Sequence, residues 1–310
     1  MVTNWGDRHY HQTYLFWLGT FILCLLQSNQ IFALTFSLPD VSDNIIGEVR
    51  IVKVSPDESI YSIARENDVG ITELLAANPQ ISGTHLKSGA KIIIPTARVL
   101  PDAPHSGIII NLPEMRLYYF PPYRAVVMTF PIGIGREGWE TPIQQTSVLS
   151  KEEAPFWYPP DSIREYSWRN KGVLLNKVVP PGPDNPLGDY AIHLTLTGYL
   201  IHSTNQPNSV GKRSSSGCIR MYPEDIEQLF YQVNPGTPVY IIHQPYKLGH
   251  YHNEFYLEIH KPLPGYNQST PVPEMIRKAT QDEKVELDWQ RISATINHNM
   301  GFPILVGRGA

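Results

Sequence analysis

A cysteine and a histidine sixteen positions before it are the residues of this 310-residue chain best suited to covalent chemistry. Cys218 lies in a polar loop, and His202 ends a short apolar run that is typical of a strand. A thiol attacks a carbonyl only as thiolate, so it needs a nearby base or cation. His202 is the natural base, because the polar sequence between them allows the chain to turn back. Either residue alone is more often structural, but together they predict acyl transfer.

The sequence around the cysteine offers two further aids to acyl transfer. The Ser-Ser-Ser-Gly run that precedes Cys218 is flexible, so its backbone N–H groups, including that of Gly217, can hold an oxyanion. Lys212, Arg213 and Arg220 bring positive charge, which favours thiolate over thiol. We therefore expect a polar, cationic loop around an activated sulfur.

This pattern, His202 followed by Ser-Ser-Gly-Cys-Ile-Arg over 215–220, resembles the signature of the L,D-transpeptidases with a YkuD-type catalytic domain. Over roughly residues 106–243 the resemblance includes Phe130–Gly135, Thr141-Pro142, Trp157, Val179–Gly188 and Met221–Phe230. The resemblance implies a substrate: the thiolate attacks the carbonyl between the diaminoacyl residue and the terminal D-alanine of a peptidoglycan tetrapeptide stem. An amine then takes the acyl group, and neither a metal nor a cofactor is needed.

Two positions depart from the commonest family pattern. Ser216 stands where many members have histidine, and Ser203 stands where many have glycine. A serine hydroxyl can still donate one hydrogen bond to substrate. With Gly217, we expect both serines to line the oxyanion and substrate side of the site. Arg220 suits a carboxylate on the stem, and a structural ion pair under the cysteine loop is the alternative.

Residues 49–96 form a separate short unit. Periodicity predicts strand, helix, helix and strand over 49–54, 55–65, 71–78 and 91–95, with Thr72 at the cap position of the second helix. The order resembles a LysM module, whose family binds the N-acetylglucosamine backbone of peptidoglycan or chitin. A small structural cap for the neighbouring domain is the alternative.

The catalytic region, 106–243, consists mainly of short strands, predicted at 108–111, 116–120, 125–130, 198–202 and 239–243. One helix begins at Pro223, carries two acids in its first turn and closes before Pro235-Gly236. The fold class is therefore α+β: a βααβ LysM-like module, then a mostly β domain, a meander or sandwich with one helix after the cysteine loop.

Three segments carry weaker signals. Residues 97–105 are interpreted as a linker. Residues 138–188 show little periodicity and many prolines and aromatics, which favours a lid or wall over Cys218; a proline-stapled surface cover is the alternative. The extension 244–310 contains one amphipathic helix candidate, Glu274–Ile292, and three histidines that we interpret as surface residues and not as metal ligands, His250, His252 and His260.

Residues 1–33 predict a secretory signal peptide. The apolar run Tyr14–Leu26 is too short to span a bilayer comfortably, and Ala33 offers a small residue at the cleavage site. An uncleaved N-terminal anchor is the alternative. Loss of Cys24 with the signal leaves Cys218 unpaired, and an unpaired cysteine in an oxidising compartment is either buried or used. We expect an exported protein of the periplasm or cell wall.

The interpretation that these observations favour is an exported L,D-transpeptidase of cell-wall biogenesis and cell shape. Its partners are glycan strands and tetrapeptide stems; a net charge of −4 and the lack of a long basic run argue against nucleic acid. The rivals are a cysteine peptidase or amidase and an inactive wall-binding LysM protein. The acceptor is a stem amine, a lipoprotein lysine or water. Cations beside Cys218 favour the stem, whose amine has a carboxylate on the same carbon.

Overall fold

The computed structural model describes residue 1 and residues 33–40, 42–83, 86–266, 270–281 and 284–309. The expected signal peptide therefore lies almost wholly outside the described residues. From Ala33 onward the described residues belong to one compact unit. No helix among them is long and apolar enough to cross a membrane.

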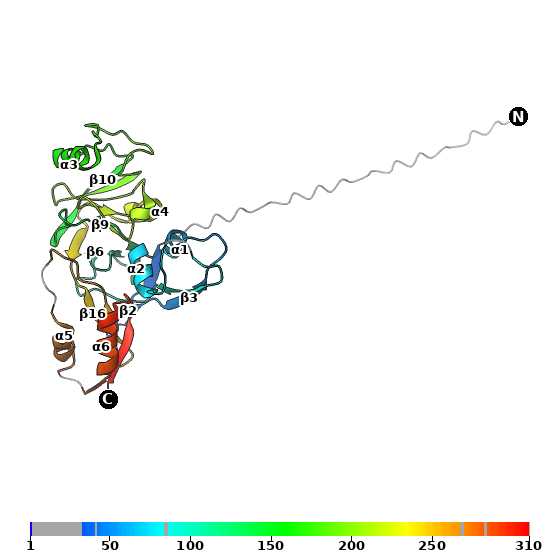
Figure 1. Cartoon of the computed structure of the whole chain (residues 1–310), viewed down its shortest axis with the longest axis vertical. Coiled ribbons are helices and arrows are strands. Elements are labelled where there is room, and N and C mark those ends of the chain that lie inside the picture. Colours follow the sequence, from blue (N-terminus) through cyan, green and yellow to red (C-terminus); the bar gives the residue numbers. More distant parts are fainter. Residues whose placement is uncertain (2–32, 41, 84–85, 267–269, 282–283, 310) are drawn as a thin grey trace. The chain divides into compact units, whose positions relative to one another are not determined.

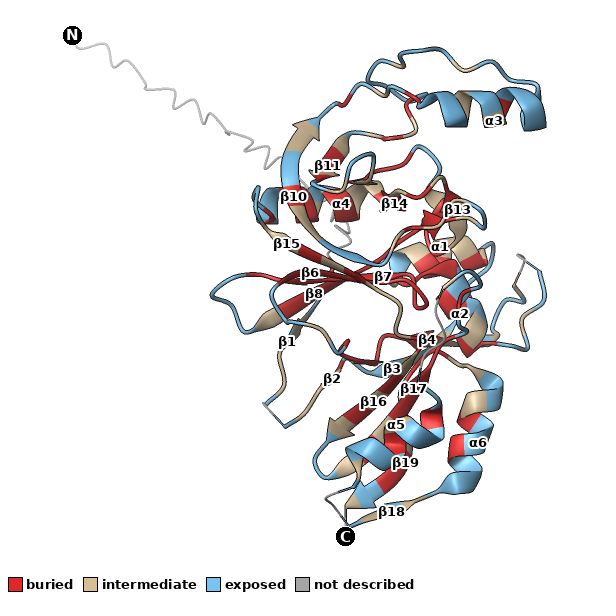
Figure 2. Cartoon of the chain, turned by 90° about the vertical axis from the view of Figure 1, so that its left-hand side faces the viewer, coloured by how far each residue is buried: buried red, intermediate tan, exposed pale blue. Residues whose placement is uncertain are grey.

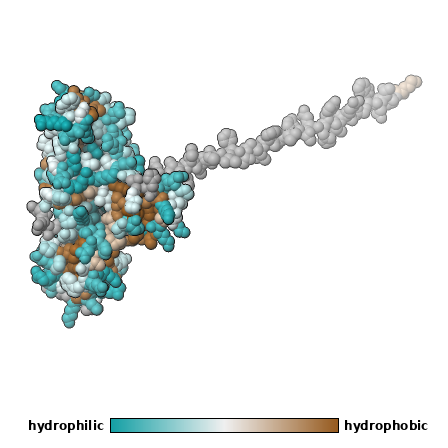
Figure 3. Space-filling model, in the orientation of Figure 1, coloured by the Kyte–Doolittle hydropathy of each residue, from teal (hydrophilic) through white to brown (hydrophobic). Residues whose placement is uncertain are grey.

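The LysM-like segment forms strand, helix, helix and strand in the predicted order (Figure 1). Its elements are β3 (Val49–Lys53), α1 (Ile60–Glu66), α2 (Ile71–Ala77) and β4 (Lys91–Pro95), and the two strands pair antiparallel over a small apolar core. Val49 and Ile51 leave apolar side chains exposed on this segment. Figure 3 shows brown on the surface of the same part of the chain. The prediction that Thr72 caps α2 was wrong, because the cap is Gly70, whose N–H donates to the Glu73 carboxylate.

The catalytic region is built on a nine-stranded sheet, with strands in the order β1-β8-β7-β6-β15-β10-β11-β12-β14. Their bounds are β1 (Leu34–Ser37), β6 (Gly107–Asn111), β7 (Arg116–Phe120), β8 (Val126–Pro131), β10 (Gln144–Glu153), β11 (Tyr190–Leu194), β12 (Leu200–His202), β14 (Ile219–Arg220) and β15 (Pro238–Ile242). Only the pairs β15–β6 and β12–β14 are parallel among these strands. The five predicted strands are confirmed, and Figure 2 shows how deeply β6, β7 and β8 are buried.

Shorter elements place the cysteine loop at the edge of this sheet. They are β9 (Ile134–Gly135), η1 (Pro207–Ser209), β13 (Arg213–Ser215) and α4 (Pro223–Gln232). Helix α4 begins at Pro223 as predicted, because its fixed φ suits the first helical position. Ile226 and Leu229 on one face of α4 enter the main core. The helix therefore anchors the chain directly after the cysteine.

Residues 138–188 contain more regular structure than the sequence suggested. They include the whole of the ten-residue strand β10 and helix α3 (Asp161–Lys171), so the interpretation of this stretch as one long loop region was wrong. In β10 only Val148 is buried, and in α3 only Ser167 is buried, as the pale α3 in Figure 2 shows. Neither element has the apolar period that reveals a strand or helix in sequence.

The expected linker, 97–105, is held in the fold. Its strand β5 (Arg98–Val99) pairs with β2 (Ile45–Ile46), and the Arg98 side chain is fully buried. Its prolines suggested a linker, but the ionic contact of Arg98 with Glu73 fixes its start in the fold. A buried arginine has to be paired, and no sequence period reports such a pairing.

The C-terminal extension folds as a four-stranded sheet with two helices. These are β16 (Tyr246–Tyr251), β17 (Glu254–Ile259), α5 (Val272–Ala279), β18 (Val285–Leu287), α6 (Trp289–His298) and β19 (Ile304–Gly309). The single helix Glu274–Ile292 was wrong, because α5 ends at Ala279 and Asp288 caps a new helix by accepting from the Arg291 N–H. The surface assignment was also wrong for His260, which is buried against Glu258.

Candidate active site

The two residues singled out from the sequence lie on neighbouring parallel strands. Strand β12 pairs with β14 so that His202 stands opposite Arg220, and Cys218 immediately precedes β14. Side chains alternate between faces along a strand, so His202, Cys218 and Arg220 share one face. The thiol itself donates to the Gly198 carbonyl at 3.7 Å, and no hydrogen bond joins it to the imidazole in the described structure.

His202 is buried and oriented by the chain next to it. Its Nδ1 lies 2.6 Å from the Ser203 carbonyl oxygen, which places the proton on Nδ1 and leaves the Nε2 lone pair available. Burial, and then the positive charge of Arg220, lowers the pKa of His202 to about 3. The imidazole is therefore neutral near pH 7 and can accept a proton.

Cys218 rests as a thiol. Burial raises the pKa of the Cys218 sulfur, while the Leu200 N–H and the Arg220 guanidinium act in the opposite direction. The side chain is still partly exposed. A neutral thiol beside a neutral imidazole requires proton transfer at the moment of attack.

Two of the three cations expected beside the sulfur lie elsewhere. The Lys212 ammonium contacts the Tyr61 hydroxyl of α1 at 3.0 Å, and Arg213 pairs with Glu140 at 3.6 Å. Only Arg220 acts electrostatically on Cys218. Spacing in sequence could not show this, because both misplaced cations find partners that are distant along the chain or across a turn.

Arg220 has no carboxylate partner among the residues that the structure describes, so the alternative of an ion pair under the loop is not seen there. Its Nε atom is buried and makes no hydrogen bond. An arginine without a counter-ion inside a site that already holds a thiol and an imidazole is suited to binding an anion.

The remaining site candidates fall into different places. The Ser216 hydroxyl is half-buried and accepts a hydrogen bond from Arg136. The Ser203 hydroxyl is buried without a partner beside Gly188, so Ser203 contributes through its carbonyl. The Gly217 N–H donates to the Ser215 hydroxyl at 3.1 Å, so it is not free for an oxyanion in this structure. The Cys218 N–H is then the remaining candidate for the oxyanion donor.

Comparisons with known proteins identify the family of this chain. A model of the L,D-transpeptidase catalytic domain, YkuD, matches residues 105–241, and a LysM domain model matches residues 52–95. The chain is 39% identical over 284 residues to "Probable L,D-transpeptidase YcfS" of Escherichia coli (strain K12), with 88% of each chain covered. It is 38% identical over 308 residues to "Probable L,D-transpeptidase ErfK/SrfK" of the same strain, covering 93% of this chain and 97% of that one. This chain belongs to the L,D-transpeptidase family. The solved catalytic domain of the Enterococcus faecium L,D-transpeptidase is 24% identical, with a TM-score of 0.35, and covers 46% of this chain and 100% of that one.

This L,D-transpeptidase contains a cation that sequence reasoning missed. Arg136 donates from Nη1 to the Ser216 hydroxyl at 2.9 Å and to the Ser215 carbonyl at 3.2 Å. Its guanidinium lies over the rings of Trp139, at 4.7 Å, and Tyr166, at 4.2 Å. Tyr166 belongs to α3, so segment 138–188 does reach the cysteine loop. The only sequence signal was the position of Arg136 directly after the Ile-Gly-Ile-Gly run.

Both flanking parts of the transpeptidase also support the loop between His202 and Cys218, the LysM side directly and the C-terminal extension through Thr141. Thr72 of α2 donates to the Gly211 carbonyl, and a side chain at Gly211 would clash with the start of α2. On the other side, the Tyr266 hydroxyl donates to the Thr141 carbonyl at 2.8 Å. The buried Thr141 hydroxyl in turn donates to the Gly217 carbonyl at 2.7 Å. The matched catalytic domain is thus supported from outside its own limits.

One cluster of potential metal ligands lies within the described residues. Glu114, Glu258 and His260 bring one ligand atom each to within 4.8 Å of one another. The Lys247 ammonium sits among them, 2.9 Å from a Glu114 oxygen and 2.8 Å from a Glu258 oxygen. The ammonium pairs with both carboxylates, so we interpret the cluster as an ion-pair network.

Proposed function

We propose that the chain is an exported cysteine L,D-transpeptidase of peptidoglycan. The Cys218 thiolate attacks the carbonyl between the diaminoacyl residue and D-alanine of a tetrapeptide stem. D-Alanine leaves, a thioester remains, and an amine then takes the acyl group. The observation that carries the proposal is a neutral His202, with Nε2 available, on the same face as Cys218 and an Arg220 without a counter-ion.

His202 serves as both base and acid in this mechanism. Its Nε2 takes the thiol proton as sulfur attacks, after the thiol turns from the Gly198 carbonyl. The imidazolium that forms is buried beside Arg220, so it returns the proton readily to the departing amine of D-alanine. The Ser203 carbonyl keeps the ring in place throughout. The Cys218 N–H stabilises the oxyanion, an interaction worth about 3–4 kcal/mol per donor in well-studied hydrolases.

Arg220 and Arg136 form the subsite for the stem carboxylate. Burial lowers the pKa of Arg220, the thiolate form of Cys218 raises it, and the charge of Arg136 lowers it again. Neither guanidinium has a carboxylate partner among the described residues. A substrate carboxylate between them relieves their repulsion and makes charge-assisted hydrogen bonds.

A comparison of stems with free and amidated diaminoacyl carboxylates tests this subsite. We expect amidation to lower kcat/KM by about tenfold to a hundredfold, from the loss of hydrogen bonds to a charged group. Arg136→Met should shrink this preference, whereas Arg124→Met, at an exposed turn, should leave it unchanged. Equal rates on both stems in the native enzyme would exclude the subsite.

The nucleophile and base are tested by substitution. Cys218→Ser should abolish release of D-alanine without a change in unfolding midpoint, because a partly exposed loop side chain contributes little to the core. His202→Ala should lose thioester formation at neutral pH and recover part of it as pH rises, since hydroxide can generate the thiolate. His252→Ala, at an exposed position, is the control. A pH response without recovery would assign His202 an orienting role instead.

Two rival activities share part of this chemistry. A cysteine peptidase or amidase passes through the same thioester but ends with water, so product analysis with and without an added amine separates it from a transpeptidase. An inactive wall-binding protein forms no thioester. Exposure of the intact chain to a carbapenem, followed by mass spectrometry, would show an adduct on Cys218 only for an active site.

We propose a stem amine as the acceptor and not a lipoprotein lysine. The stem amine has a carboxylate on the same carbon, which a lysine side chain lacks. Arg220 and Arg136 supply the cations for this choice; Lys212 and Arg213, which the sequence suggested, are engaged elsewhere. Mass spectrometry of digested wall, from cells with and without the gene, should show loss of stem-to-stem dimers. Unchanged dimers with loss of wall-bound lipoprotein would reverse the choice.

The LysM module would hold the enzyme on glycan strands, in the periplasm or cell wall. Its α1 and α2 contact the catalytic region, while the turn before α1 is exposed. Tethering raises the effective concentration of stems near Cys218. Binding of the Cys218→Ser chain to purified sacculi, competed by soluble N-acetylglucosamine oligomers, tests this role. Failure of these oligomers to compete would assign the module a purely structural function.

A further inference from the structure

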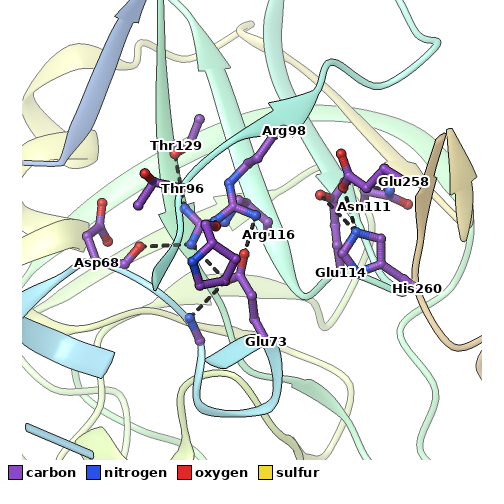
Figure 4. Close-up of polar contacts among 12 residues, drawn as sticks. Asp68, Glu73, Thr96, Arg98, Asn111, Glu114, Arg116, Thr129, Glu258 and His260 are labelled. Carbon is purple, nitrogen blue, oxygen red and sulfur yellow. Dashed lines mark hydrogen bonds and ion pairs between the residues drawn. The ribbon is translucent and has the colours of Figure 1, made fainter. Parts of the chain in front are cut away.

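A buried group of charges joins the LysM module to the catalytic sheet (Figure 4, left). Glu73 of α2 pairs with Arg98 and with Arg116 of β7, the latter at 3.0 Å. The Arg116 Nη2 also donates to the Asp68 backbone carbonyl at 2.8 Å. Asp225, near the start of α4, is buried as well and is electrostatically coupled to Asp68. The group therefore has three carboxyls and two guanidiniums.

Polar atoms on both sides of this group lack a hydrogen bond, Nε of Arg98 and of Arg116 as well as carboxyl oxygens, but the carboxyls outnumber the guanidiniums. Asp68 is 2% exposed and Asp225 is 1% exposed, and one carboxyl oxygen of each, Oδ1 and Oδ2 respectively, makes no hydrogen bond. Burial raises the pKa of Asp68 to about 7, against the opposing charges of Arg116 and Arg98. Burial and the charge of Asp68 raise the pKa of Asp225 well above its usual range. Such a site is suited to receiving one more cation.

The chain supplies a nitrogen at this place. The Leu34 N–H donates to Asp68 Oδ2 at 2.9 Å, and Leu34 is the first residue of β1, which pairs with β8 of the main sheet. The residue before it, Ala33, is the small residue at which the sequence suggested signal cleavage. As an amide, this nitrogen is a neutral donor, whereas a chain that began at Leu34 would carry an ammonium there.

We propose that hydrolysis of the Ala33–Leu34 bond creates an N-terminal ammonium at Leu34 that forms a buried ion pair with Asp68. A peptidase of the signal-peptidase class adds water across the C–N bond, so that Ala33 becomes a carboxylate and the Leu34 nitrogen takes up protons. This inference rests on the export signal in the proposed function. The new ammonium stabilises the ionised carboxylate of Asp68. It also brings the positive charges of the junction to the same number as its carboxyls.

The position of the pair links processing to the catalytic loop. Asp68 lies between the two helices of the LysM module, Leu34 opens a strand of the central sheet, and Asp225 lies in α4. Helix α4 follows Cys218 after four residues, 219–222. Ala33 now donates its own N–H to the Gln228 side chain of α4 at 3.0 Å, a contact that cleavage removes. The ammonium replaces this contact with a stronger one.

Three chains test the proposal: one that begins at Leu34 with a free amine, the same chain acetylated at Leu34, and one that begins at Ala33. Each unit by which the ammonium lowers the pKa of Asp68 corresponds to about a tenfold gain in the folding equilibrium constant. At pH 7 we expect urea denaturation to give a folding equilibrium constant at least about tenfold higher for the chain with the free Leu34 amine than for the acetylated chain. Asp68→Asn should abolish that difference. Equal stability of the free and acetylated chains would overturn the ion pair.

Two further measurements complete the test. If Asp68→Asn does not fold, the rate of acetylation of the Leu34 amine against pH replaces it, because an ion pair raises the pKa of the α-amine above its usual value near 8. An α-amine whose pKa is not raised would exclude the ion pair. N-terminal sequencing of the exported protein should begin at Leu34, and any other first residue overturns the processing step. Release of D-alanine from stems, measured on the acetylated chain, tests the transpeptidase function separately.

Discussion

Two buried ionic clusters tie the catalytic sheet to its flanking parts, and they differ in how complete they are (Figure 4). In the C-terminal cluster, Lys247 contacts Glu114, Glu258 and the Val99 carbonyl, and the Tyr118 hydroxyl donates to Glu114. Among the described residues, none of the side-chain atoms of this cluster is buried without a partner. The LysM-side cluster has unpartnered oxygens on Asp68 and Asp225 and unpartnered Nε atoms on Arg98 and Arg116.

This difference indicates when each junction is completed. The polar side-chain atoms of the C-terminal cluster all find partners among the described residues of 99–260, so folding alone satisfies them. The LysM-side cluster obtains its last cation only if the chain is cut before Leu34. A buried charge without a partner costs several kcal/mol, so the second junction should be the weaker one in the uncut chain. The two junctions can therefore be broken separately.

The largest effect is expected from Glu73→Gln. The substitution leaves Arg98 and Arg116, both fully buried, without their shared carboxylate, and breaking a buried pair costs about 3–5 kcal/mol. Because α2 also supports Gly211, turnover of soluble stems should fall together with stability. Urea denaturation and D-alanine release measure the two effects. Glu66→Gln, at an exposed position of α1, is the control, and a loss under about 1 kcal/mol for Glu73→Gln would contradict the assigned role.

Lys247→Met should have a smaller effect on the C-terminal junction. It removes the ammonium from Glu114 and Glu258, but the contact of His260 with Glu258, at 2.6 Å, remains. We expect a loss of about 2–3 kcal/mol, at the lower end for a broken buried pair. Lys278→Met, exposed on α5, is the matched control. A more stable variant would show that desolvation of the charges outweighs their attraction in the native enzyme.

The two clusters should respond to pH in opposite directions. In an acetylated Leu34 chain, the folded pKa of Asp68, about 7, lies above its ordinary 3.8, so stability from this group is present below about pH 4 and is lost as pH rises to 7. Lysine and histidine lower the pKa of Glu258 to about 2 against the effect of burial, so its contribution is present above about pH 4.5 and is lost on acidification. Urea midpoints from pH 2 to 8 measure both. Asp68→Asn should remove the first slope and Glu258→Gln the second; persistence of either slope would point to other groups.

Much of the fold could be predicted because local sequence patterns indicate it. Helix α4 has a proline, early acids and an apolar face, and the LysM elements have short apolar periods, so their order followed from sequence. Strand β10 and helix α3 could not be predicted in this way, because each buries a single residue. Arg98 and Lys247 are buried by partners that are distant in sequence, and no local pattern shows such pairing.

The candidate site shows the same limit. The roles of Cys218 and His202 were expected from residue type and spacing, and the parallel pairing of β12 with β14 puts both on one face. Two of the three cations expected beside Cys218 are engaged elsewhere, and Arg136, directly after β9 and far earlier in the chain, reaches the loop instead. Only the tertiary structure could show that Lys212 turns to Tyr61 instead.

The smallest effects should come from removing two hydroxyls, one in each flanking part, that link these parts to the cysteine loop. Thr72→Val removes the donor to Gly211, and Tyr266→Phe removes the donor to Thr141, whose hydroxyl holds the Gly217 carbonyl. Each should cost about 0.5–1.5 kcal/mol of stability, the net value of one hydrogen bond. Their effects on catalysis should differ, because Thr141 contacts the residue adjacent to Cys218, whereas Gly211 lies seven positions earlier.

We therefore expect Tyr266→Phe to lower the rate of Cys218 acylation at saturating carbapenem. The carbapenem concentration that gives half of the maximal rate should stay unchanged. Thr72→Val should alter stability alone. Tyr256→Phe, which removes a hydroxyl that contacts Glu254 in the C-terminal sheet, is the control for loss of a tyrosine hydroxyl. Equal acylation rates in all three variants would show that the C-terminal extension supports the fold but does not position the nucleophile. A reduced rate in Thr72→Val alone would assign that positioning to the LysM side.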